Sequence, residues 1–457
     1  MTINGTRYLS STEIAERYLA FFSTRDHKVL SASPLVLPGN STSFTIAGMQ
    51  PLLPYLRGEV EPPYPRLTAL QRCLRSDDAD AVGSNERKNT SFHMLGQWSI
   101  NDYGKREAIT MAWELLVNEF GLDPADMWAT VFEGDAELCI LPDEVAIEQW
   151  TRLGVQPDHI VSLGAEDNLW TIGGSAGPCG PCSEIYIDRG LERGCGSPGC
   201  RPGCDCDRFL EIWSLVFMEY ELHTDGKISS LPLHNIDTGM GLERMASVLQ
   251  NAESVYAIDL FQPALQRLLE LAPVGVAGGG AVEARARRMI VDHMRAFLLV
   301  GVEGVLPGRD GRNSVVRRLI RRAARQGRLL GIDRPFLGEL LEPLAQGHGS
   351  LLTPDERRMV GSLVRIVTQE ETMFERVLSV GLRSLAQIEP EHDSVVSGAH
   401  LFTLHAEKGF PADLAAEVLA ERGLSVDWSA YELALEGHRQ VSRQGAEQHF
   451  KSGSIQS

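Results

Sequence analysis

Hydrophobic positions recur at helical spacing near the start of the chain and in two strand-like blocks soon after it. The first helix is predicted to begin at a capping box formed by Ser10 and Glu13. Residues 67–75 and 91–99 are largely apolar and flank a polar segment at 76–90, which is typical of two strands joined by a loop. The buried face of the first helix is predicted from the spacing of Ile14, Tyr18, Phe21 and Phe22.

The periodicity changes from mixed to helical after about residue 250. A glycine-rich segment at 275–280 is expected to be a flexible connector. The predicted fold class is α+β, with a mixed domain at 1–245 followed by an all-helical domain at 246–457. The remaining predicted elements are strands at 28–30 and 210–220, a helix at 106–120, and an extended stretch that becomes a helix at 231–250.

Composition places the chain among soluble globular proteins. Of its 457 residues, 43% are hydrophobic and 23% are charged, which excludes collagen-like and disordered chains. No apolar run reaches the ~20 residues that cross a bilayer, and the first residues lack the pattern of an export signal. We therefore expect a cytoplasmic protein without a membrane partner, whose 8 cysteines are reduced thiols or metal ligands.

Positive charge is concentrated in one segment of an acidic chain. The formal net charge of −18 excludes a uniformly basic nucleic-acid-binding protein, yet residues 285–328 hold 12 Arg, no Lys and only 3 acids. Within this segment an apolar stripe predicts a helix, and its arginines are expected to bind nucleic-acid phosphates, which suit a guanidinium. The alternative is a solvated face whose arginines pair with acids of the same protein. The stripe consists of Val316, Leu319, Ile320 and Ala323, and the arginines are Arg317, Arg318, Arg321, Arg322 and Arg325.

Three other segments carry residue types suited to nucleotide chemistry. Residues 71–75 end a strand with Arg75, where a guanidinium can bind a phosphate or a carboxylate. Residues 88–98 place a cation four positions before an aromatic ring, which suits a phosphate and a purine. Residues 235–244 contain Gly-Met-Gly, which lets a ligand approach the backbone closely, ahead of Arg244 in the first turn of a helix.

In this order and at this spacing, the three segments resemble the signature motifs of class II aminoacyl-tRNA synthetases, and the match extends to the alanyl-tRNA synthetase family. The resemblance covers about residues 10–442. It implies an antiparallel sheet flanked by helices, then a helical domain that recognises the tRNA acceptor stem. The matching stretches, in family order, are 44–49, 71–75, 92–105, 167–170, 177–185, 211–213, 237–244 and 315–325.

The resemblance also implies roles for single residues. Arg75 corresponds to the arginine that binds the ATP α-phosphate and the amino-acid carboxylate, Asp237 to the carboxylate that binds the substrate ammonium, and Arg244 to the cation above adenine. These three are the expected catalytic residues. The expected ATP-binding residues, which act with Mg²⁺, are Arg75, Lys88, Phe92, Gly241 and Arg244. The expected amino-acid-binding residues are Met49, Arg75, Trp170, Ser214, Val216, Asp237 and Gly239.

Departures from the family pattern bear on specificity. Ser214 stands where the family usually has an Asn that contacts alanine, which leaves serine and glycine as alternative substrates. Arg309 stands where the family reads the acceptor stem with an Asn, whereas Asp413 keeps the family's acidic residue. The expected tRNA-binding residues are Arg309, Arg317, Arg318, Arg321, Arg322, Arg325 and Asp413.

The cysteines fall into separate groups. Cys195, Cys200, Cys204 and Cys206 lie close together in a glycine- and proline-rich segment, which predicts a tetrahedral Zn²⁺ site; the alternative is four reduced surface thiols. A Cys-x-x-Cys pair, Cys179 and Cys182, is expected to be structural. Cys73 and Cys139 are expected to be buried as small apolar residues.

The leading hypothesis is an alanine–tRNA ligase-like enzyme that forms alanyl-adenylate from ATP and transfers alanine to the 3′ end of tRNA-Ala. We expect aminoacylation and tRNA-recognition domains only, without the editing and C-terminal domains that the family normally has. One alternative is a short paralogue in natural-product biosynthesis or resistance, with another amino acid or acceptor. The other is a catalytically dead RNA-binding regulator.

Overall fold

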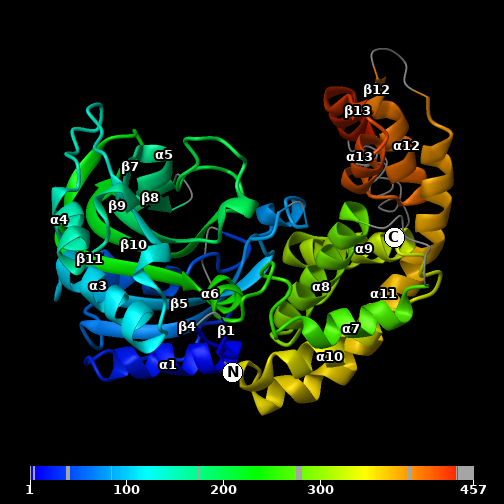
Figure 1. Cartoon of the computed structure of the whole chain (residues 1–457). Coiled ribbons are helices and arrows are strands. Elements are labelled where there is room, and N and C mark those ends of the chain that lie inside the picture. The colour runs from blue at the N-terminus through cyan, green and yellow to red at the C-terminus, as the bar shows by residue number, and fades with distance from the viewer. Residues whose placement is uncertain are drawn as a thin grey trace, which may run out of the picture.

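The computed structural model describes residues 2–3, 6–37, 42–83, 85–172, 175–273, 280–389, 394–438 and 440. Figure 1 shows these residues as a sheet-containing part, in blue to green, beside an arc of helices in green to red. Most of the expected connector at 275–280 and the end of the expected helical domain, from 441, lie outside the described residues.

Within the described residues, nine strands form one sheet in the order β3-β4-β5-β11-β10-β9-β6-β7, with β8 paired to β9. The five central pairings are antiparallel, and the pairs β3–β4 and β6–β7 at the edges are parallel. The strands are β3 (Lys28–Val29), β4 (Arg66–Leu74), β5 (Ser91–Ile100), β6 (Met127–Phe132), β7 (Ile160–Leu163), β8 (Leu169–Ile172), β9 (Ser175–Asp188), β10 (Phe209–Leu222) and β11 (Ile228–Gly241). A separate two-stranded ribbon pairs β1 (Thr2–Ile3) with β2 (Thr6–Arg7).

The helices fall into two groups. Around the sheet are α1 (Ser11–Ser23), α2 (Leu53–Leu56), α3 (Lys105–Trp113), α4 (Glu144–Leu153), α5 (Ala165–Asn168) and α6 (Leu242–Leu249). After the sheet come α7 (Gln262–Leu271), α8 (Ala281–Gly301), α9 (Gly311–Leu329), α10 (Gly338–Gly347), α11 (Pro354–Ala386), α12 (Gly398–Lys408) and α13 (Ala412–Ala420). None of the described helices combines the length and the apolar character that a membrane span requires.

The predicted first helix is confirmed as α1, and it begins at the capping box of Ser10 and Glu13. Its apolar face lies on the sheet, where Tyr18 packs against Trp213 of β10 with ring centroids 5.6 Å apart. The predicted strand pair is confirmed as β4 and β5, and the predicted helix at 106–120 is α3 continued by a π-helical turn. The α+β class is therefore confirmed.

The region after the sheet follows the predicted helical pattern. The apolar stripe of α9 is fully buried, so this helix packs with the face that its periodicity predicts. Two short strands, β12 (Val395–Val396) and β13 (Ser425–Val426), pair in parallel, so this region is not purely helical. The two parts of the chain are joined by Arg72 of β4, which donates to both oxygens of Glu356 in α11 at 2.5 and 2.9 Å.

Candidate active site

A cavity of about 210 Å³ opens on the sheet where β4, β5, β10 and β11 lie next to one another. It brings together six residues that the sequence predicts for substrate binding, from three separate segments. The predicted members are Arg75, Lys88, Phe92, Gly239, Gly241 and Arg244, and the other lining residues are Asp78, Arg87, Asn89, Met94, Glu211 and Glu243.

Arg75 and Phe92 form one wall of the cavity. Arg75 follows the last residue of β4, and its Nε donates to the backbone oxygen of Ile46 at 3.1 Å. Its guanidinium carbon lies 5.0 Å from the centre of the Phe92 ring. The guanidinium is exposed and the ring is half-buried, and groups of these kinds can bind an anion and stack on an aromatic base, respectively. Lys88 lies 3.6 Å from Asp78 in the same wall.

Arg244 and a pair of carboxylates form the opposite wall. Arg244 Nη1 donates to Glu211 Oε2 at 2.8 Å, which fixes the guanidinium at the start of α6. Burial and the neighbouring Glu211 raise the pKa of Glu184 to about 8, against the lowering effect of a hydrogen bond from Tyr186. Carboxylate oxygens are the ligands that Mg²⁺ prefers, so the side chains of Glu184 and Glu211 are candidates to hold this ion.

Asp237 lies on β11 on the same face as Gly239 and Gly241, because side chains alternate along a strand. A Cβ at Gly239 would come within 2.8 Å of Met94 Sδ, so glycine at this position leaves room for the Met94 side chain. The carboxylate is buried and accepts a hydrogen bond from Trp98 Nε1 at 2.6 Å. Burial raises the pKa of Asp237 to about 7, against the hydrogen bond from Trp98, which lowers it.

An apolar cluster lies next to Asp237. Val216 is directly opposite Asp237 in the β10–β11 register, and Ser214 is opposite Gly239. Met49, Trp98 and Val216 belong to one buried cluster, and the partly buried Trp170 packs against it. Six of the seven expected amino-acid-binding residues therefore lie around the end of β11, beside packed apolar side chains: Met49, Trp170, Ser214, Val216, Asp237 and Gly239. Of the seven, Arg75 and Gly239 line the cavity itself.

A buried ion pair between Glu243 and Arg295 lies beside the cavity. Glu243 accepts hydrogen bonds from Arg295 of α8 at 2.8 Å and from the backbone and ring of His93. Burial raises the pKa of Glu243, but Arg295 and His93 outweigh it and bring the pKa to about 2. Glu243 directly precedes Arg244, so this network fixes the start of α6 to the helical part of the chain.

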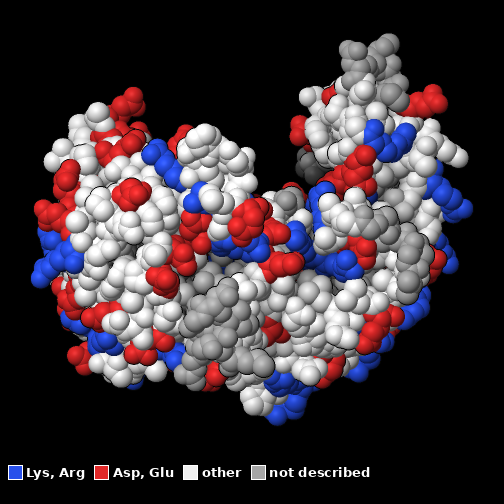
Figure 2. All heavy atoms as spheres, in the orientation of Figure 1, with Lys and Arg blue, Asp and Glu red and all other residues white. Residues whose placement is uncertain are grey.

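Arg309 and Asp413 line a second cavity, of about 290 Å³, beside α9. Most arginines of α9 pair with acids of this chain: Arg317 and Arg321 with Glu370 at 2.8 and 2.9 Å, and Arg318 with Asp413 at 4.0 Å. Figure 2 shows this mixture as basic and acidic side chains next to one another in the hollow between the two parts of the molecule.

The expectation that all five arginines face a nucleic acid is wrong for two of them. Arg322 and Arg325 are only 2% and 3% exposed. Arg322 pairs with Asp80 and Glu417, each at 2.6 Å, and Arg325 pairs with Glu421 at 2.5 Å. Their charge holds elements together, because their acidic partners come from segments that the helical periodicity does not reveal.

The four clustered cysteines lie in the segment between β9 and β10. Their sulfur atoms are all within 4.8 Å of one another, and the closest pairs are Cys195–Cys204 at 3.6 Å and Cys200–Cys206 at 3.5 Å. Cys73 is buried as expected, and Cys179 and Cys182 are buried too. Cys139 is exposed, so the prediction that it fills a core position is wrong; it lies in a turn with a positive φ of 56°.

Sequence reasoning missed the roles of Trp98, Glu184 and Glu211. Trp98 lies two positions after Gly96 on β5, and its ring covers the space that a Cβ there would fill, at 2.3 Å. Both glutamates fall within stretches that resemble the family, but only strand pairing puts Glu184 opposite Ser214, next to the cavity. The alternation of polar and apolar residues along β9 and β10 was the one signal in the sequence that could have indicated these two glutamates.

The sheet brings together an arginine at the end of one strand, an aromatic ring on the next strand and a second arginine after a Gly-x-Gly turn. This is the architecture of class II aminoacyl-tRNA synthetases. The chain belongs to the family of class II (A) tRNA synthetases, whose family model matches residues 13–456.

Within that family, the chain is similar to proteins named alanine–tRNA ligase. It is 38% identical to the one from Acetivibrio thermocellus over 445 residues, and 41% identical to the one from Desulforudis audaxviator over 442 residues; each match covers 95% of this chain and 49% of the relative. The chain thus spans about half the length of the curated relatives it matches. Among solved structures, the pyrrolysyl-tRNA synthetase PylSc of Desulfitobacterium hafniense has a TM-score of 0.31 at 11% identity, covering 55% of this chain and 73% of that chain.

Proposed function

We propose that this chain activates alanine with ATP and transfers it to the 3′ end of tRNA-Ala. The observation that carries the proposal is the cavity in which Arg75, Phe92 and Arg244 meet, with the buried Asp237 and its apolar cluster next to it. The names of the relatives support alanine as the amino acid. Apolar side chains beside a carboxylate suit a zwitterion with a methyl side chain.

The first reaction joins two anions. A carboxylate oxygen of alanine forms a bond to the α-phosphorus of ATP, and the bond to the β-phosphate oxygen breaks with release of pyrophosphate. Arg75 binds the α-phosphate and the alanine carboxylate, so it offsets the charge that opposes their approach. Asp237 binds the ammonium of alanine, and Phe92 and Arg244 hold the adenine. In the second reaction the 3′-terminal hydroxyl of the tRNA attacks the alanyl carbonyl, and AMP leaves.

Glu184 and Glu211 are the residues that fit Mg²⁺. Burial and the neighbouring Glu211 raise the pKa of Glu184, and Arg244, which pairs with Glu211 at 2.8 Å, lowers it. A divalent ion at this position would supply charge neutralisation for the phosphates of ATP. The clustered cysteines fit Zn²⁺, since four thiolates form its preferred tetrahedral site.

We assign residues 1–245 to aminoacylation and residues 246–457 to recognition of the tRNA acceptor stem. Arg309 and Asp413 line one cavity beside Arg317, Arg318 and Arg321, which supports a single contact surface for the stem. On binding tRNA, these arginines would exchange their carboxylate partners for phosphates, which replaces one anionic partner with another.

ATP–pyrophosphate exchange with each standard amino acid tests the first reaction, and charging of tRNA-Ala tests the second. We expect exchange with alanine and charging of tRNA-Ala. Exchange with serine or glycine but not alanine would favour the altered-substrate alternative, which Ser214 motivates. Absence of exchange with every amino acid would favour the RNA-binding regulator.

A further inference from the structure

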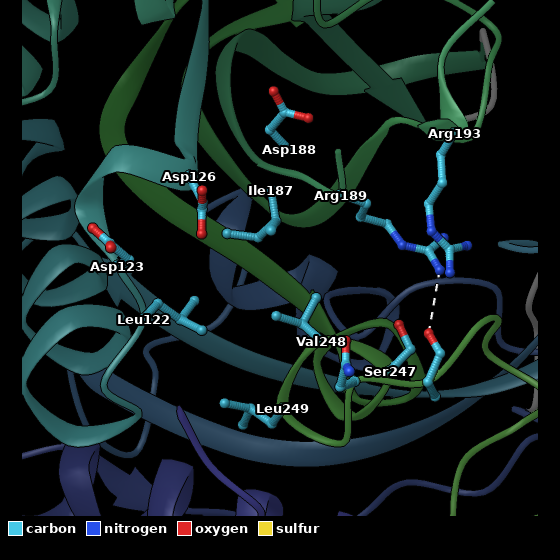
Figure 3. Close-up of a pocket in the computed structure, with 12 residues that line it drawn as sticks. Leu122, Asp123, Asp126, Ile187, Asp188, Arg189, Arg193, Ser247, Val248 and Leu249 are labelled. Carbon is cyan, nitrogen blue, oxygen red and sulfur yellow. Dashed lines mark hydrogen bonds between the residues drawn. The ribbon is translucent and has the colours of Figure 1, made fainter. Parts of the chain in front are cut away.

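Hydrogen bonds hold the loop that carries the four cysteines at both of its ends. Near its beginning, Arg189 donates to the backbone oxygens of Ala252 and Glu253 at 3.2 and 2.5 Å, and Arg193 donates to that of Glu253 at 2.8 Å. Figure 3 shows both arginines extending into a cavity of about 280 Å³ that lies outside the candidate active site. At its end, Arg208 binds both oxygens of Asp188 at 2.8 and 2.5 Å.

The cysteine loop also binds Glu86 and Arg87, two consecutive residues of the loop between β4 and β5. Glu86 accepts a hydrogen bond from Arg193, two positions before Cys195, at 2.9 Å. Arg87 donates to the backbone oxygens of Asp205 at 3.1 Å and of Cys206 at 3.3 Å. It also pairs with the Asp205 carboxylate at 2.5 Å. The cysteines thus lie between the two points at which the loop holds Glu86 and Arg87.

Arg87 also lines the nucleotide cavity, with Lys88, Asn89 and Phe92 following it along the chain. A shift of the cysteine loop would therefore move the residues that are expected to contact ATP. A misplacement of about 1 Å in such groups is enough to weaken binding or catalysis severely.

The sulfur positions suit one metal ion. With Zn–S bonds of about 2.3 Å, a tetrahedral site requires sulfur atoms about 3.8 Å apart. The two closest pairs, at 3.6 and 3.5 Å, are near this value and well beyond the ~2.05 Å of a disulfide. Four thiolates around Zn²⁺ carry two net negative charges, which the neighbouring Arg87 and Arg208 would partly offset.

We propose that Zn²⁺ bound by Cys195, Cys200, Cys204 and Cys206 locks this loop, and that the locked loop holds Arg87 in the nucleotide cavity, so that zinc binding and ATP binding are coupled. The inference rests on the proposed function only in taking ATP as the ligand of that cavity. Because coupling between two binding sites is reciprocal, ATP raises the affinity for zinc by the same factor by which zinc raises the affinity for ATP.

The first test is the metal itself. Elemental analysis of the purified chain is expected to give one zinc per chain, and Co²⁺ exchanged into the site is expected to show the absorption of tetrahedral thiolate coordination. Cys200→Ser is expected to lose the metal, whereas Cys139→Ser, at an exposed cysteine outside the cluster, is expected to retain it. Retention of zinc by Cys200→Ser, or absence of zinc from the unaltered chain, would overturn the site.

The second test measures coupling without any reaction. Calorimetry is expected to give an ATP dissociation constant about fivefold to tenfold higher for the zinc-depleted chain, and a chromophoric chelator is expected to remove zinc more weakly by the same factor when ATP is present. Arg87→Met is expected to keep one zinc per chain and to bring this factor close to one, since the mechanical link is removed. Equal ATP affinity with and without zinc in the unaltered chain would refute the coupling.

These readouts are independent of amino-acid activation. If exchange fails with every amino acid while zinc and ATP remain coupled, the proposed function is wrong and the inference stands. If exchange with alanine is normal while zinc is absent, the inference is wrong and the proposed function stands.

Discussion

The indole nitrogen of Trp98 donates a hydrogen bond to Asp237 Oδ1 at 2.6 Å, and both side chains are buried. The bond crosses from β5 to β11, where the two residues are direct neighbours in register. It is the one hydrogen bond that lowers the pKa of this carboxyl group, which burial otherwise raises to about 7. We therefore expect the charge of Asp237, and with it the affinity for the substrate ammonium in the proposed reaction, to change within the physiological pH range.

We predict that the KM for alanine falls as pH rises from about 6 to about 8, by about tenfold. Asp237 with a pKa of about 7 is mostly protonated at the lower pH and cannot pair with the substrate ammonium. At the higher pH it is mostly ionised and can. Exchange assays at fixed, saturating ATP measure this dependence, and a KM that is constant over the range would contradict the assignment.

Trp98→Phe is expected to move the same transition to higher pH, because it removes the hydrogen bond that favours the ionised carboxylate. The substitution keeps an aromatic ring over Gly96. A shift of the profile without a change in the KM for ATP separates this effect from general damage to the site. An unshifted profile would mean that Trp98 does not set the charge of Asp237.

Asp237→Asn is expected to abolish exchange and yet to stabilise the fold at about pH 8. The folded-state pKa of Asp237, about 7, lies above the unfolded value of about 4. The free energy of unfolding therefore falls as pH rises between these two values, and it stays lowered above them. Removing that charge is expected to raise the free energy of unfolding by about 2 to 4 kcal/mol. Denaturant unfolding at about pH 8 and about pH 5 provides the comparison, and an equal effect at both would contradict the reasoning.

Arg75→Ala is expected to lower the exchange rate by about a hundredfold to a thousandfold, since the charge that offsets two anions is lost. Arg75→Lys keeps the charge without the bidentate fork and is expected to recover only part of the rate. Both variants are expected to fold normally, because Arg75 is exposed and makes a single hydrogen bond, to the backbone of Ile46. Near-normal exchange by Arg75→Ala would remove this residue from the mechanism.

The place of Phe92 could be predicted from the sequence, whereas that of Glu184 could not. Phe92 and Arg75 lie at predicted strand ends of one strand–loop–strand unit, so local periodicity places them together. Glu184 lies near Glu211 of the cavity because β9 pairs with β10, and neither pattern nor spacing indicates which distant strands become neighbours. The same reason explains Arg322, whose partner Asp80 lies more than two hundred residues earlier and converts an expected RNA contact into an internal ion pair.

Substitutions of different arginines in α9 are expected to separate effects on tRNA binding from effects on the stability of the fold. Arg317→Ala combined with Arg318→Ala is expected to raise the KM for tRNA by about tenfold and to reduce the salt dependence of tRNA binding, while exchange stays unchanged. Their side chains are 29% and 37% exposed, so the fold loses little.

Arg322→Met is the matched control on the same helix. Its guanidinium is buried between Asp80 and Glu417, so its loss leaves Glu417 without its main partner and is expected to lower the free energy of unfolding by about 1 to 3 kcal/mol. Thermal unfolding, exchange and tRNA charging are measured on both variants. The Arg322 variant is expected to lose stability. If the double variant at 317 and 318 also loses stability, and loses exchange with it, then α9 serves only the fold and the tRNA-binding surface lies elsewhere.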